Sequence, residues 1–209
     1  MPVVTLLLTH GMTLLNAVLT TAPTVDPMEI SEAQEHLILT GQESYINELL
    51  LTSRVMVERY LGRSLTLQTW TAYANNWCRE FLLPYAPLLS VTSMKYYGQD
   101  AVLTTLATSE YWVDKTKEPG RITFAYNFAA PTLQEGRPNA IEIVYTAGYL
   151  ASGTSEQMQH AIPDPIRHAM KILMTDMHEH RGQYVIGNQS TKMPGFVRDL
   201  LHPYRIYNF

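Results

Sequence analysis

The sequence predicts an α+β fold: a helical hairpin plus a long C-terminal helix, with an inserted antiparallel β region and extended N- and C-terminal arms. Three observations lead to this prediction. Apolar residues recur at helical spacing before residue 62 and after residue 163. Between residues 64 and 150 the period changes to two, with many Thr and aromatic residues. Both ends of the chain are rich in apolar residues without sustaining either pattern.

Three helices are predicted. The first two, over residues 31–39 and 43–61, form the hairpin, and Gly62 is typical of the residue that follows a helix end. The third covers residues 164–181, where Pro165 suits the first helical turn and apolar residues form one stripe. This last helix is the long C-terminal helix of the predicted fold.

The β region is predicted over residues 64–150. Stretches such as "SLTLQTWTAY", "GRITFAY" and "NAIEIVYTAGY" alternate and are separated by turn signals that contain Gly and Pro. At ordinary strand and turn lengths, this region holds about five or six antiparallel strands.

Composition favours a chain that is partly covered by other chains. Charged residues make up 16% of the 209 residues, below the usual value of about 25%. The 13 Tyr and 10 Met residues are types that protein–protein contacts favour. The net charge of −4, without a basic run, does not indicate bulk attraction to nucleic acid. The apolar N-terminus is interrupted by polar residues, so no membrane segment is predicted, and we expect a strand or an arm that packs on another surface.

The stretch "MTDMHEHRGQYV" is the main candidate for chemistry, because it contains His178, Glu179, His180 and Arg181. In the HExxH motif of zinc metalloproteases, two histidines lie four residues apart on one face of a helix and bind one ion. Here they are two apart and point about 200° away from each other. The pattern therefore favours a charged, solvated last turn over a metal site. We predict no catalytic residues, no metal and no cofactor, and we expect the single cysteine, Cys78, to be buried.

An ordered set of segments across residues 26–206 resembles a known family. The segments are "ISEAQEHL", "VERYLGRSL", "PLLSVTSMKYYG", "EPGRI", "IPDPIRHA" and "LLHPYRI". Together they resemble the head–tail connector proteins of tailed bacteriophages, also called adaptor or head-completion proteins. The resemblance implies a structural protein of the virion, located at the head–tail junction (the neck) and in the host cytoplasm during assembly.

The resemblance also implies partners. The chain would form a homo-oligomeric ring, a dodecamer, beneath the portal protein. That ring would join the capsid to the next neck or tail protein. Phage DNA would pass through its lumen without sequence-specific binding, and no membrane would be involved. Two alternatives remain: another neck or tail ring protein, such as a stopper or tail terminator, and a metal-dependent hydrolase that uses His178 and His180.

We predict three parts of the chain: an N-terminal arm over residues 1–28, most of which lies outside the resemblance, a connector domain over residues 29–182 and a C-terminal docking arm over residues 183–209. On the resemblance, the C-terminal arm would dock on the portal through Met193, Pro194, Phe196, Leu200, Leu201, Pro203, Tyr204 and Arg205. His178 stands where relatives tend to have an aromatic residue, and with Arg181 it is the candidate for a contact between subunits.

Overall fold

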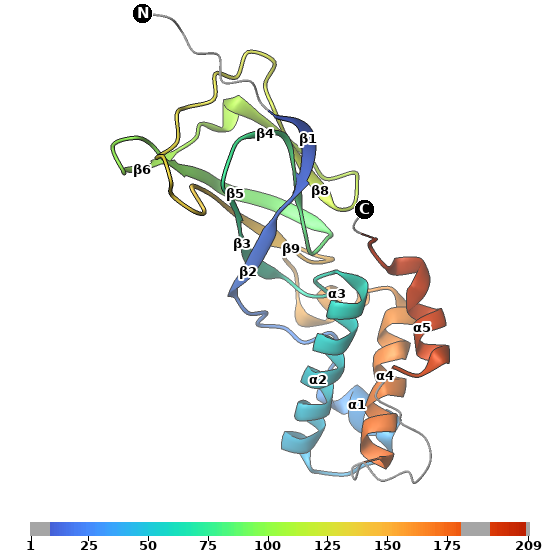
Figure 1. Cartoon of the computed structure of the whole chain (residues 1–209). Helices are drawn as coiled ribbons and strands as arrows, with labels where there is room; N and C mark the ends of the chain where they lie inside the picture. Colours follow the sequence, from blue (N-terminus) through green and yellow to red (C-terminus); the bar gives the residue numbers. More distant parts are fainter. Residues whose placement is uncertain (1–8, 181–192, 208–209) are drawn as a thin grey trace, which may run out of the picture.

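The computed structural model describes residues 9–180 and 193–207. Within them, strands and helices separate into two parts that share one junction (Figure 1). The strands form the β part, and a cluster of helices forms the helical part below it in the same view. The chain passes from strands to helices, back to strands and back to helices, so several segments cross the junction.

The described strands form two sheets, a four-stranded sheet in the order β1-β4-β8-β7 and a five-stranded sheet in the order β2-β3-β9-β5-β6. Neighbouring strands are antiparallel except for β1 and β4, which are parallel. The bounds are β1 Thr9–Leu14, β2 Asn16–Thr21, β3 Gln68–Ala74, β4 Cys78–Leu83, β5 Leu88–Tyr97, β6 Leu103–Thr105, β7 Tyr111–Asp114, β8 Gly120–Phe124 and β9 Ile141–Ala147. A short 3₁₀ turn, η1 (Thr108–Glu110), precedes β7.

The β core follows from the alternation in the sequence. Every second residue of β9, from Ile141 to Ala147, is buried, as the period of two requires. Trp77 packs edge-on against Phe124, with ring centroids 5.4 Å apart. The hydroxyl of Tyr145, which is fully buried, donates a hydrogen bond to the carbonyl of Pro84 at 2.8 Å. Cys78 is buried in this core as expected.

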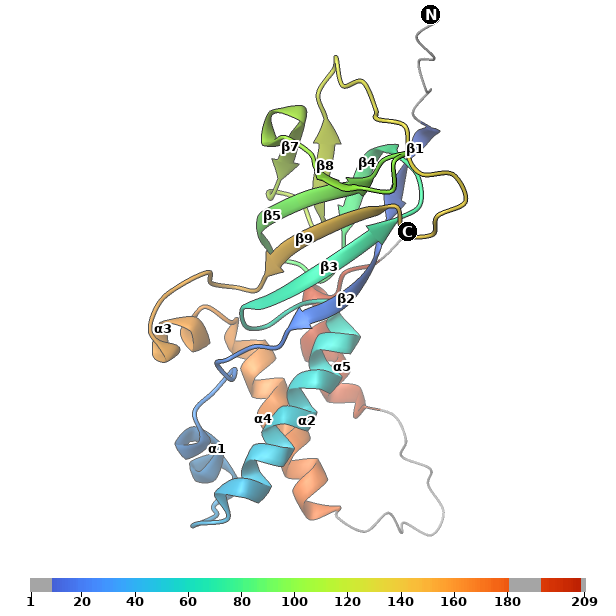
Figure 2. The same ribbon diagram turned by 90° about the vertical axis from the view of Figure 1, so that its left-hand side faces the viewer.

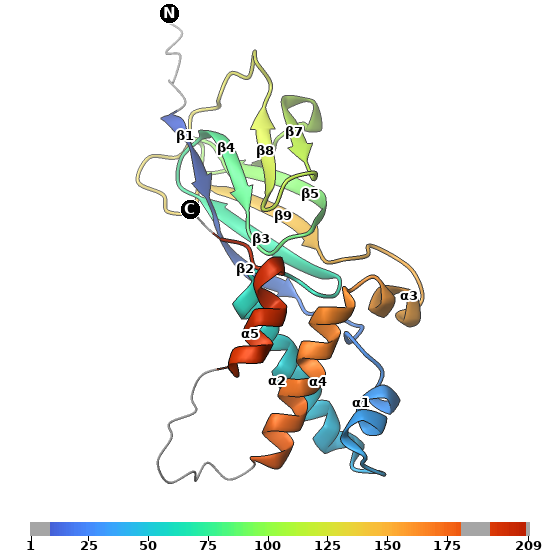
Figure 3. The same ribbon diagram turned by 90° about the vertical axis from the view of Figure 1, so that its right-hand side faces the viewer.

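The helical part is built on α2 and α4, which lie side by side in Figures 1 and 3 and contact each other. The bounds are α1 Ile30–Leu37, α2 Glu43–Leu61, α3 Ser155–His160, α4 Asp164–Glu179 and α5 Gly195–Leu201, with a 3₁₀ turn, η2, at His202–Tyr204. Leu50 of α2 and Met170 of α4 are fully buried in a second apolar core. None of the described helices is both long enough and apolar enough to cross a membrane.

The junction is fixed at the end of α2. Gly62 has a φ of 69°, the left-handed conformation that glycine adopts without strain, and it turns the chain toward β3. The carboxylate of Glu58 then accepts hydrogen bonds from the Leu65 N–H at 2.9 Å and from the Gln68 side chain at 2.6 Å. Burial raises the pKa of Glu58. Backbone and side chain together set the direction in which β3 leaves the helix.

The fold class predicted from the sequence is wrong in its long C-terminal helix and its extended arms. The longest described helix is α2, with 19 residues, and α4 has 16. Residues 9–21 form β1 and β2 instead of an arm, and residues 195–204 form α5 and η2. What the structure supports is a mixed α+β chain with two sheets. The arms failed as a prediction because their pairing depends on segments far away in the sequence.

The burial of α2 on one face predicts different costs for two substitutions on this helix. Leu50→Ala removes a fully buried side chain of α2, whereas Val55→Ala changes an exposed one on the same helix. We expect Leu50→Ala to lower the free energy of unfolding by about 2–5 kcal/mol, and Val55→Ala by no more than about 0.5 kcal/mol. Urea unfolding followed by circular dichroism measures both. Equal losses for the two variants would contradict the packing of α2 described above.

Candidate docking surface

The C-terminal helix α5 packs on the helical core through one face. Val197 and Leu201 are four residues apart, so they share a face, and both are fully buried. The neighbouring Phe196 points outward, with 63% of its surface exposed. The helix begins after Pro194, whose carbonyl accepts the Arg198 N–H at 3.1 Å. Within the segment predicted as an arm, residues 195–201 therefore form a docked helix, with Val197 and Leu201 in the core and Phe196 exposed to solvent.

Arg63 holds the end of this segment to the rest of the chain. Its Nε donates to the carbonyl of Tyr204, and its two terminal nitrogens donate to the carboxylate of Glu118, one of them at 2.7 Å. Burial opposes the charge of Arg63, but the hydrogen bond and the charge of Glu118 outweigh it and raise the pKa of Arg63. This planar, two-pronged contact is the geometry in which an arginine binds a carboxylate most strongly.

Two further contacts fix the residues that follow η2. The Ile206 N–H donates to the carbonyl of Leu61, the last residue of α2, at 2.8 Å. The guanidinium carbon of Arg205 lies 4.9 Å from the ring centroid of Tyr60 and 5.1 Å from that of Tyr207. A cation held over aromatic faces at this distance is attracted to them. Residues 204–207 thus follow the end of α2 closely.

The eight residues predicted to dock on a partner fall into three groups. Leu201 is fully buried within its own chain, so in this conformation it contributes to stability instead of to an accessible surface. The partly buried residues are Met193, Pro194, Leu200 and Tyr204. The exposed residues are Phe196, Pro203 and Arg205, and we refer to these three as the exposed C-terminal residues.

The histidines of the predicted solvated turn contact different neighbours. The Nδ1 of His178 lies 3.2 Å from the hydroxyl of Tyr45, so the contact it makes here is between α4 and α2 of one chain. The Nδ1 of His180 lies 3.2 Å from the carboxylate of Asp176. Arg181, the other candidate for a subunit contact, lies outside the described residues. Among those described, no group of three or more His, Cys, Asp or Glu side chains could hold a metal ion.

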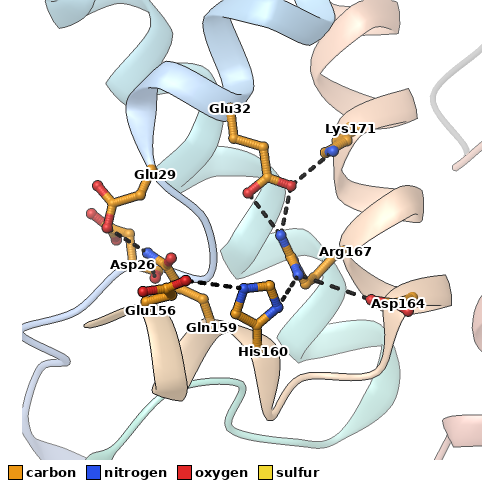
Figure 4. A network of polar contacts seen from close by, with 9 residues as sticks. All are labelled: Asp26, Glu29, Glu32, Glu156, Gln159, His160, Asp164, Arg167 and Lys171. Carbon is orange, nitrogen blue, oxygen red and sulfur yellow. Dashed lines mark hydrogen bonds and ion pairs between the residues drawn. The ribbon is translucent and has the colours of Figure 1, made fainter. Parts of the chain in front are cut away.

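A network of polar contacts ties α1 and the segment before it to α3 and α4 (Figure 4). The carboxylate of Glu32 accepts two hydrogen bonds from Arg167, at 2.6 and 2.7 Å, and lies 2.8 Å from Lys171. The amide nitrogen of Gln159 donates to the carboxylate of Glu29 at 3.1 Å. Burial alone would raise the pKa of Glu32, but the hydrogen bonds and charges of Lys171 and Arg167 lower it.

Sequence reasoning missed these ion pairs, although it had singled out the segments that contain them. Arg63 belongs to "VERYLGRSL", Glu118 to "EPGRI" and Tyr204 to "LLHPYRI". Glu32 and Arg167 come likewise from "ISEAQEHL" and "IPDPIRHA". Five of the segments that carry the resemblance therefore meet in two polar contacts. The available signal was their charged residues, but nothing in one sequence says which charges pair.

A comparison with protein-family models matches residues 28–207 to the head completion protein family. The match covers most of the chain, and the chain belongs to this family. The resemblance predicted from the sequence is thereby confirmed. So are a head–tail joining function in a phage-like particle and a location at the head–tail junction. A search of curated proteins finds no match.

Solved structures show the same fold. One chain, from a structure described as the virion of a native gene transfer agent particle, is 19% identical, with a TM-score of 0.72 over 92% of this chain and 96% of that one. A second, from the neck of the empty particle computed with C6 symmetry, is 21% identical, with a TM-score of 0.72 over 93% and 97%. A third, from the neck of the native particle computed with C12 symmetry, is 22% identical, with a TM-score of 0.67 over 93% and 96%.

The pKa of Glu32 predicts how its contribution to stability depends on pH. The folded pKa lies below the ordinary value of 4.5, so the ionised form stabilises the fold above that value, and the contribution is lost as the pH falls through the folded pKa. Glu32→Gln should lower the free energy of unfolding at pH 7 by about 1–3 kcal/mol. The difference from the unsubstituted chain should shrink below pH 4.5.

Urea unfolding at a series of pH values measures this difference. Glu35→Gln is the matched control, because Glu35 is exposed on the same helix. It should change little at any pH. A Glu32→Gln deficit that stays constant down to strongly acidic pH would show that the Arg167 and Lys171 contacts do not stabilise the ionised carboxylate.

Proposed function

We propose that the chain is the adaptor of a tailed phage or phage-like particle, a ring of identical copies beneath the portal. The ring joins the capsid to the next neck or tail protein and leaves a passage for DNA. Membership of the head completion protein family supports this function. Two similar structures come from necks computed with C6 and with C12 symmetry, which supports a ring, and twelve copies would satisfy both symmetries.

The observation that carries the portal contact is the fixed position of the C-terminal segment. Val197 and Leu201 are buried and Arg63 donates a hydrogen bond to the carbonyl of Tyr204. These contacts hold the segment that carries the exposed C-terminal residues against the helical core. Phe196 is an exposed aromatic next to a buried position, which is the kind of side chain that anchors protein–protein contacts. The portal would therefore bind the exposed face of α5, which is already helical before the contact forms.

The remaining partners follow from the same arrangement. The next neck or tail protein binds the ring on the side away from the portal. DNA passes through the lumen without sequence-specific contacts, and the net charge of −4 suits a passage that does not retain it. The proposal includes no catalytic step and no cofactor. His178 lies beside Tyr45 and His180 beside Asp176.

A single substitution tests the portal contact. Phe196→Asp places a charge on the exposed surface of α5 and leaves the buried residues in place, so the variant should fold. We expect it to lose most of its binding to portal-bearing heads of its own particle, measured by co-sedimentation. Tyr126→Asp is the matched control, because Tyr126 is a fully exposed aromatic in the loop after β8. It should bind as the unsubstituted chain does.

The test also separates the alternative functions. A stopper or tail terminator would not contact the portal and would bind heads only after an adaptor had been added. Binding of the unsubstituted chain to adaptor-free heads supports the adaptor. Removing the whole C-terminal segment is a poorer test, because it would expose the apolar surface that Val197 and Leu201 cover.

A further inference from the structure

The β part has two open sides, and each is formed by one continuous stretch of chain. Strands β1 and β2 follow each other and form one edge of both sheets, over residues 9–21, which we call the first side. Strands β6 and β7 form the opposite edges, and residues 102–114 are called the second side. Figures 2 and 3 show β1 and β7 at opposite ends of the β part.

The first side is an edge without the usual protection. Exposed strands normally carry charged residues or proline, because unpaired backbone groups otherwise attract strands of other chains. Residues 9–21, "THGMTLLNAVLTT", contain no Lys, Arg, Asp, Glu or Pro. Four large apolar side chains are exposed on it: Met12, Leu14, Val18 and Leu19.

Strand β2 exposes a large apolar side chain on each of its two faces. Successive residues of a strand point to opposite faces, and the adjacent Val18 and Leu19 are 61% and 42% exposed. Along its outer edge β2 pairs with no other described strand. Apolar side chains that stay exposed to water are unfavourable in free energy, and a neighbouring chain that covered them would remove this cost.

The second side is apolar as well. Trp112 of β7 is 61% exposed, and two residues of the β6 stretch, Val102 just before the strand and Leu103 at its start, are exposed as well. Tryptophan is one of the residue types enriched among those that contribute most of the binding energy of protein interfaces. The second side also carries two acidic residues, Glu110 and Asp114. The first side has no acidic residue that would repel them if the two sides came into contact.

We infer that the first side of one copy packs against the second side of the next copy. Two different patches on opposite edges of one molecule make a heterologous contact, which closes into a ring when the rotation between copies allows. A second copy is the occupant that the chain itself supplies, and it covers both apolar sides at once. The inference deepens the proposed ring and rests on it for closure, but it concerns the contact between copies and not the portal.

Two charged variants test the contact. Val18→Glu blocks the first side and Trp112→Glu blocks the second, and both side chains are largely exposed, so the folds should be retained. Thermal unfolding checks this. Sedimentation velocity over a wide concentration range should show multimers for the unsubstituted chain and monomers for each variant alone. A mixture of the two variants should form dimers and nothing larger, because one intact first side then meets one intact second side.

Val55→Glu serves as the matched control, since Val55 is an exposed apolar residue on α2 and belongs to neither the first nor the second side. It should assemble like the unsubstituted chain. The inference is overturned if the unsubstituted chain stays monomeric at every concentration, if Val18→Glu or Trp112→Glu still forms multimers, or if the mixed variants remain monomeric. It is also overturned if Val55→Glu alone abolishes assembly, because the ring contact would then lie on the helices.

The outcome is distinguishable from a failure of the proposed function. Chains that assemble through the two sides but ignore portal-bearing heads would keep this inference and contradict the portal contact. Chains that bind heads through Phe196 while Val18→Glu and Trp112→Glu still form multimers would keep the portal contact and contradict this inference.

Discussion

The buried guanidinium of Arg63 binds groups from separate parts of the chain and so connects them. Arg63 follows the end of α2, its carboxylate partner Glu118 lies between β7 and β8, and the carbonyl it binds belongs to Tyr204 in η2. A buried charge without partners is costly, and loss of either partner would leave that cost uncompensated. The need to pair Arg63 therefore fixes the β part, the helical part and the C-terminal segment relative to one another.

This constraint changes how binding to a partner would work. An extended arm loses conformational freedom when it docks, and that loss weakens binding. Here α5 is already ordered by Val197 and Leu201 and by the Arg63 contact, so a partner need not supply that ordering. The pairing of Glu32 with Arg167 likewise fixes a segment near the N-terminus. It holds α1, which follows the N-terminal strands, against α4.

The sequence predicted local structure well and distant pairing poorly. The predicted helix over residues 43–61 matches α2, because its apolar spacing and Gly62 are local signals. The parallel pairing of β1 with β4 had no local signal, since it joins strands more than 60 residues apart. In α5, seven residues are too few for periodicity to show that Val197 faces the core and Phe196 the solvent. Family resemblance indicated the function, but only the structure could show which of the docking candidates are buried and which are exposed.

In the proposed neck, copies of this chain form a ring in direct contact with the portal. Cryo-electron microscopy of the assembled neck would show this contact. We expect a closed ring of this chain against the portal, with α5 on the portal side and neighbouring copies joined through the β part. A neck in which another protein separates this chain from the portal, or in which α5 has left the α2–α4 core, would contradict it.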